Sequence, residues 1–392
     1  MSEIRSALAE NFSITEGGPM HRLLVLLRIA GEERQRVIRR ALAIAVITWV
    51  PLLTLSLVQG QADGRHITIP FLRDYAVNVR LLIAVPILIL AESGIDRRWR
   101  ILVLQFFKSG LVNAKELPVF EAVIASITRF RDSVLPETIM FVAAFLPLFI
   151  TRTEFLMGNV SNWHSTETGD ISMAGWYFNL VSTPLVRFLL LRWLWRIILW
   201  TYLLWRVSRL NLYLVATHTD LAAGLGFLSE GQKAFSPIVF ACGAIVASQV
   251  ANTVAYQGAT LSSQKFPMIA YGVLAIIFLV APLLVVAPVL VQVKRKALRE
   301  YGALVTIHNQ QFDQKWIQHE QSSDATMLGN PDASSLADLG GSFTVVREMG
   351  IVPIDKPTLI TLALAAALPM VPVVLFATPA DELIRLVLKM LG

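Results

Sequence analysis

The chain has 392 residues, of which 55% are hydrophobic and 16% are charged, whereas a typical soluble domain has about 25% charged residues. With a mean hydropathy of +0.60, this composition excludes an ordinary soluble protein and predicts an all-α polytopic membrane protein, whose first partner is the lipid bilayer. The net charge is +6, but the basic residues cluster between apolar runs, which favours membrane orientation over nucleic-acid binding. A single cysteine, Cys242, excludes an internal disulfide and a multi-cysteine metal site.

Seven apolar segments predict seven transmembrane helices, since each is near the ~20 residues that cross a bilayer. We expect a cytoplasmic segment at 1–40, six spans within 41–291 with a cytoplasmic amphipathic insert at 94–133, a cytoplasmic helix and loop at 292–356, and a seventh span with an amphipathic tail at 357–392. The spans are predicted at Ala41–Val58, Ala76–Ala91, Val134–Thr151, within Trp176–Trp205, and at Phe235–Ala255, Phe266–Val291 and Leu359–Ala377.

The distribution of basic residues predicts the orientation. With the N-terminus in the cytoplasm, 24 of the 34 Lys and Arg residues fall in cytoplasmic segments, 7 on the opposite side and 3 inside the fourth span. Because cytoplasmic loops are enriched in Lys and Arg, this bias favours a cytoplasmic N-terminus and an external C-terminus.

Two stretches of the cytoplasmic insert have helical character. Apolar residues recur at three- and four-residue spacing through Lys115–Asp132, which predicts an amphipathic helix on the membrane or on the bundle. Arg97–Val112 is interpreted as a second amphipathic helix or a re-entrant element.

The sixth span is expected to continue into the cytoplasm as a helix over residues 294–321. One face of this helix carries a stripe at helical spacing, which fits packing on a neighbour and predicts a homo-oligomer as one alternative. Its members are Leu298, Tyr301, Val305, His308, Phe312, Trp316 and His319. The Ser-, Asp- and Gly-rich residues Ser322–Gly341 are predicted to form a loop, and no internal repeat of 20–50 residues is found.

The fourth span is the most informative, because it carries Arg187, Arg192 and Arg196 and no acid. An arginine inside a membrane is costly and normally has a partner or a polar cavity. Helical geometry places Arg192 and Arg196 on one face and points Arg187 away. The pair is interpreted as a structural ion pair with Glu137 or Glu92, or as a contact for an anion, a lipid headgroup or a substrate.

A polar stripe on the fifth span supplies further candidate binding residues. Ser248, Asn252 and Tyr256 follow one another at intervals of four, with Gln249 beside them. Interhelical hydrogen bonding is the simpler explanation, and a polar pathway shared with Arg192 and Arg196 is the functional one.

His218 and Asp220, in the turn after the fourth span, are weak catalytic candidates as an acid–base pair. Two such residues do not make a metal site, so no metal is expected. Nucleotide-binding, metalloprotease and serine-hydrolase motifs are missing from the sequence, and no cofactor is predicted. The absence of these motifs makes an enzyme the less favoured class of protein.

The strings HTDLAAGLGFL, EYGALVTIHNQQFDQKW and SLADLGGSFTVVREMGIVPI resemble segments of an uncharacterised family of bacterial polytopic membrane proteins. The resemblance covers the fourth to the seventh span and implies a bacterial plasma-membrane location. It implies no activity. The residues themselves favour a transport or channel-like protein, or an accessory to one. The alternatives are a membrane-embedded enzyme acting on a lipid or lipid-linked substrate, and a structural or sensory scaffold.

Overall fold

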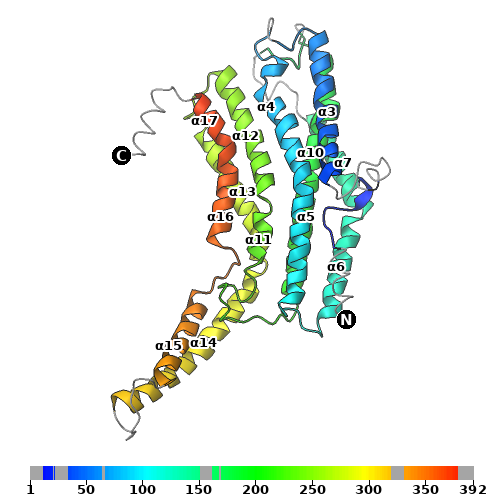
Figure 1. Ribbon diagram of the computed structural model, residues 1–392. Helices are drawn as coiled ribbons and strands as arrows, with labels where there is room; N and C mark the ends of the chain where they lie inside the picture. Colours follow the sequence, from blue (N-terminus) through cyan, green and yellow to red (C-terminus); the bar gives the residue numbers. More distant parts are fainter. Residues whose placement is uncertain are drawn as a thin grey trace.

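The structure is a computed structural model that describes residues 12–20, 22, 34–63, 67–150, 161–166, 169–318 and 331–377. Within these ranges every regular element is a helix, supplemented by three isolated β-bridges. Most helices stand roughly alongside one another in a bundle, and a pair of helices extends from one end of it (Figure 1). The all-α polytopic architecture predicted from composition is confirmed.

Six stretches of helix in the described residues are long and apolar enough to cross a membrane. They are α3 (Arg34–Val58), α4 with α5 (Tyr75–Val79 and Val85–Lys108), α9 with α10 (Met173–Tyr177 and Thr183–Ser208), α11 with α12 (Leu228–Lys233 and Ser236–Gln257), α13 (Lys265–Leu284), and α16 with α17 (Lys356–Ala367 and Val371–Ala377). The predicted third span is α7 (Val134–Ile150), which at 17 residues is at the short limit for a span.

The insert predicted at 94–133 differs from its prediction in one respect. The second helix does not end near Ala91, because α5 continues without a break to Lys108, so the first part of 94–133 is neither a separate amphipathic helix nor a re-entrant element. Its later part forms α6 (Leu117–Arg131), whose apolar face packs toward α10, as the periodicity indicated. Lys108 ends α5 and Arg206 lies in the last turn of α10, at the same end of the bundle, which we call the basic end (Figure 1).

The second and fourth transmembrane helices share an unusual construction. Each has a five-residue α-helix, then a π-helical turn, η2 (Arg80–Ala84) or η3 (Phe178–Ser182), then a long helix whose second residue is proline. Their numbering differs by 98 throughout (173 against 75, 178 against 80, 183 against 85). Since proline has no N–H, the preceding turn widens, and the residue before Pro86 or Pro184 donates to the carbonyl five residues back. The separation of 98 residues lies outside the 20–50-residue range in which the sequence shows no internal repeat.

The largest apolar core lies between α5, α6, α10 and α12. Trp99 of α5 and Trp200 of α10 stack at its centre with ring centroids 5.1 Å apart and planes at 2°. A second core joins α3 to the outer halves of the second and fourth transmembrane helices, around Leu52, Phe71 and Trp163. The two cores hold α3, α5 and α10 side by side, which fixes the positions of the charged residues that these helices carry.

The helical pair beyond the basic end is formed by α14 (Ala287–Phe312) and α15 (Pro331–Glu348) (Figure 1). α14 is not continuous with α13, because a turn at residues 285–286 separates them between Pro282 and Pro288. The prediction of a loop through Gly341 is wrong for residues 331–341, which belong to α15. Gly302 and His308 of α14 lie against Phe343 and Ser335 of α15, so the stripe has a partner within the chain. His319 and residues 322–330 lie outside the described residues.

Candidate functional site: a buried charge cluster

Five charged side chains gather inside the bundle, where α3, α5, α7 and α10 meet. Glu92 of α5 is central: its carboxylate pairs with Arg40 of α3, lies 2.8 Å from Nη2 of Arg196, and lies 3.9 Å from Nη1 of Arg192. Glu137 of α7 places its Oε1 3.9 Å from Nε of Arg192. We call Arg40, Glu92, Glu137, Arg192 and Arg196 the charge cluster. In it, the two candidate acids face the arginine pair.

Arg196 is the most deeply buried member of the cluster, with 3% of its surface exposed. Its guanidinium lies over the ring of Trp193, 4.5 Å from the centroid, and its Nη2 also donates to the backbone oxygen of Thr15 at 3.3 Å. Its Nη1 has no hydrogen-bond partner among the described residues. A buried donor on a charged group is costly when unpaired, so this nitrogen marks a place for a further acceptor.

A segment near the N-terminus, residues 12–20, covers the cluster from the basic end, and we call it the strap. Ser13 Oγ and the backbone N–H groups of Ile14 and Thr15 all donate to Oδ1 of Asp96, at 2.7, 3.0 and 3.1 Å. The backbone N–H of Met20 donates to Glu137 Oε2 at 3.0 Å. The strap therefore joins the charge cluster through backbone groups, which carry no side-chain pattern that a sequence would reveal.

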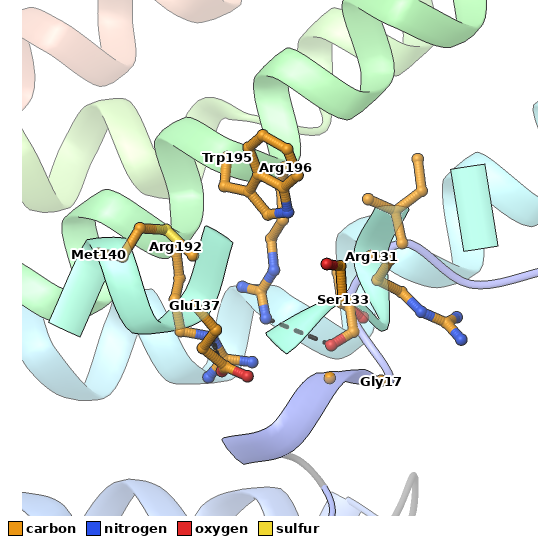
Figure 2. Close-up of a pocket in the computed structure, with 11 residues that line it drawn as sticks. Gly17, Arg131, Ser133, Glu137, Met140, Arg192, Trp195 and Arg196 are labelled. Carbon is orange, nitrogen blue, oxygen red and sulfur yellow. Dashed lines mark hydrogen bonds and ion pairs between the residues drawn. The ribbon is translucent and has the colours of Figure 1, made fainter. Parts of the chain in front are cut away.

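A small polar cavity of about 20 Å³ lies between the strap and α10. Figure 2 shows Arg192 beside Glu137, and Arg196 reaching toward the strap at Gly17. A cavity of this size has room for about one water molecule. Its lining comprises Ile14, Thr15, Gly17, Gly18, Arg131, Ser133, Glu137, Met140, Arg192, Trp195 and Arg196.

The third arginine of the fourth span lies apart from the cluster, as helical geometry predicted. Arg187 donates to the backbone oxygen of Ala144 in α7 at 3.5 Å. Arg206, at the basic end of α10, donates to the hydroxyl of Tyr202 at 2.8 Å. Arg192 and Arg196 thus remain the pair with functional potential.

The polar stripe of α12 forms hydrogen bonds to α4 and does not join the charge cluster. Asn252 donates to Asp74 Oδ1 at 2.7 Å and accepts from the backbone N–H of Tyr75 at 2.9 Å, while Tyr256 donates to the backbone oxygen of Arg73. Ser248 bonds to its own helix, and Gln249 is exposed. Asp74 precedes Glu92 by 18 residues, or roughly 27 Å of helix. In the part of the chain that the structure describes, the stripe and the arginines do not form a shared pathway.

Sequence reasoning missed a second buried polar group around Asp74. This fully buried carboxylate caps α4 and accepts from Nε1 of Trp163 at 2.9 Å. Nε2 of His164 lies 3.9 Å from it, and both ring nitrogens of His164 are buried without a hydrogen-bond partner among the described residues. Burial lowers the pKa of His164, and Arg80 lowers it further, although Asp74 opposes both effects.

His218 and Asp220 do lie together, with Nδ1 2.9 Å from Oδ1. Asp220 accepts from the backbone N–H groups of Ala222, Gly224 and Gly226 at 2.9, 3.1 and 2.8 Å. Burial opposes its ionisation, but these donors and His218 outweigh burial and lower its pKa. The glycine-containing turn therefore wraps the Asp220 carboxylate. Both residues line a pocket of about 290 Å³ with Gln105, Ser109, Tyr213 and Phe227 among its walls.

No family model, curated protein or solved structure with which the chain was compared matches it. The resemblance to an uncharacterised bacterial family stays a prediction, and the site's own chemistry carries the functional argument.

Proposed function

We propose that the chain is a membrane transport protein whose charge cluster binds a small anion. The observation that carries this proposal is the surplus of arginine over acid within the described residues. There, Arg40, Arg192 and Arg196 face the two carboxylates of Glu92 and Glu137, and Nη1 of Arg196 is unpartnered. A simple structural ion pair needs one arginine for each acid. The extra guanidinium suits a ligand with paired oxygen acceptors, such as sulfate, phosphate or a carboxylate.

The arrangement of the cluster also suits a protein with two conformations. Glu92 and Glu137 lie on different helices, and Arg192 lies between them at the outer limit of ion pairing with each. A small shift of α7 or α10 would bring Arg192 into a close ion pair with one of the two acids and move it out of range of the other. Transport needs such a two-state element, and rearranging ion pairs is a recurrent way to build one.

Binding is tested most simply by anion-dependent thermal stability of the purified protein. We expect sulfate or phosphate to raise the Tm of the parent protein above that in an equal ionic strength of a bulky organic anion, because a ligand that binds only the native state stabilises it. Arg192→Gln should remove most of that shift, whereas Arg187→Gln, on the same helix but outside the cluster, should retain it. Equal shifts in both variants would contradict anion binding by the cluster.

A second function is favoured by the pocket at the basic end. Asp220 orients the imidazole of His218, as the acid of an acid–base pair does, beside a pocket of about 290 Å³. This arrangement supports an enzyme acting on a lipid or lipid-linked substrate. Lipid that copurifies with the parent protein but not with His218→Ala would support the enzyme, and equal retention would count against it.

The remaining proposals follow from sequence alone. A bacterial plasma membrane is the location that the family resemblance implies. Homo-oligomerisation through 294–321 has weaker support, because the predicted contact stripe of α14 packs on α15. A purely structural or sensory scaffold stays a prediction from the sequence.

A further inference from the structure

The strap covers the charge cluster on the side that faces the basic end. Its closest contact with Arg196 is the carbonyl of Thr15, which accepts from this arginine where an anion's oxygen would do so. The cavity beneath the strap, about 20 Å³, is too small for sulfate, phosphate or a carboxylate. An anion that reaches Arg196 from the basic end must therefore displace the strap.

The bonds that hold the strap come from charged side chains of the surrounding helices. Arg131 Nη1 donates to the backbone oxygen of Ser13 at 2.6 Å, and Asp132 Oδ1 accepts from the backbone N–H of Gly18 at 3.0 Å. Asp96 and Glu137 accept four further bonds from strap residues. Within the strap, only Phe12 and Ile14 add buried apolar side chains. Phe12 and Ile14 are fully buried in the largest apolar core, so the charge-assisted bonds are one part of what holds the strap. They are the part that an anion can weaken, because it competes for the guanidinium groups.

We propose that residues 12–20 form a gate that closes the anion site from the basic end, with Thr15 standing in for the ligand. This inference rests on the proposed function for the identity of the ligand. The gate itself is a property of the strap and can be tested without transport. Arg131 is a positioning residue in this device, because it holds the strap through Ser13.

The test places a reporter under the strap. Thr15→Cys in a Cys242→Ala background puts a thiol at a position that is 5% exposed, and Thr15 Oγ1 makes no hydrogen bond with the described residues that would be lost. The full-length protein in vesicles is treated with a membrane-impermeant maleimide on the side of the basic end. Lys115→Cys, at an exposed position in the same background, sets the rate of an open site.

We expect the thiol at position 15 to react at least about tenfold more slowly than the thiol at position 115, and Arg131→Gln to raise its rate severalfold. Arg129→Gln changes an exposed arginine of the same helix without a described strap contact, so it is the matched control and should leave the rate unchanged. Ser13→Ala is a second loosening variant that leaves the helices intact, because it removes only the bonds of Ser13 Oγ to Asp96 and to the Glu16 N–H. Unchanged rates in both loosening variants, or labelling at position 15 as fast as at position 115, would overturn the gate.

Adding sulfate separates the two proposals. Faster labelling at position 15 with sulfate, in the Thr15→Cys protein but not when Arg196→Gln is added, supports a gate opened by an anion. If Arg131→Gln opens the strap but sulfate has no effect, the gate stands and the anion site proposed above fails.

Discussion

Arg192 of α10 lies between Glu92 of α5 and Glu137 of α7, 3.9 Å from each carboxylate. Glu92 is engaged more closely by Arg196, at 2.8 Å, and also pairs with Arg40. Glu92 therefore contacts three arginines and Glu137 contacts one, so removing each acid should change the free energy of unfolding by a different amount.

Glu92→Gln should cost about 3–5 kcal/mol of stability, because it leaves three arginines with one acid in a buried setting. Glu137→Gln should cost less, about 1–3 kcal/mol, since Arg192 keeps Glu92 and the amide oxygen can still accept from Met20. Thermal or denaturant unfolding in one detergent measures both. Similar losses for the two variants would show that the cluster is not centred on Glu92.

Asn252→Leu should destabilise the protein by about 1–3 kcal/mol, because it removes a hydrogen bond to the buried Asp74 carboxylate. Gln249→Leu, one turn away and exposed, should change stability by less than about 0.5 kcal/mol. Anion binding should be the same in both, since Asn252 lies far along the bundle from Glu92. If Asn252→Leu instead loses the sulfate-dependent Tm shift, the result would support a polar pathway shared between Asn252 and the arginines.

The protein should lose stability in mild acid because of His164. Its pKa in the folded state is lowered, so the unfolded chain binds more protons once the pH falls below the ordinary histidine value of 6.5. The stability that the neutral imidazole provides is present above pH 6.5 and is lost as the pH falls toward the folded pKa. His164→Asn should flatten the fall in Tm between about pH 7.5 and 5. If Tm falls with decreasing pH equally steeply in the parent protein and in His164→Asn, His164 is not the cause of the acid sensitivity.

Two glycines on membrane helices should respond differently to alanine. A Cβ at Gly175 of α9 would overlap the backbone oxygen of His164, whereas a Cβ at Gly272 of α13 would meet nothing within 4 Å. Gly175→Ala should therefore cost about 1–3 kcal/mol, and Gly272→Ala should be neutral or slightly stabilising. Comparing their Tm values tests the close approach of α9 to the 161–166 segment, and equal Tm values would contradict it.

Sequence alone predicted the helices and much of the cluster. The spacing of Arg192 and Arg196, and the positions of Glu92 and Glu137 near the ends of predicted spans, were enough to suggest that these acids pair with the two arginines. Arg40 was missed because it lies among other basic residues just before the first predicted span. A position at the membrane interface explained all of these residues equally well. The strap was missed because it contributes backbone groups.

Other differences have similar physical causes. Helical periodicity shows which face Asn252 occupies, but not how far along a neighbouring helix its partner lies. It therefore left both interhelical hydrogen bonding, which the structure shows, and a pathway shared with the arginines as alternatives. The small and polar residues at 331–341 have weak helix propensity, and packing against α14 overrides it in α15.

Anion flux into vesicles containing the purified protein tests the central claim most directly. The parent protein should take up labelled sulfate or phosphate faster than protein-free vesicles, and Arg192→Leu should abolish that uptake while Arg187→Leu, verified to fold, retains it. Uptake that Arg192→Leu leaves unchanged, with the variant folded, would contradict anion transport by the charge cluster and leave it as a structural ion-pair network.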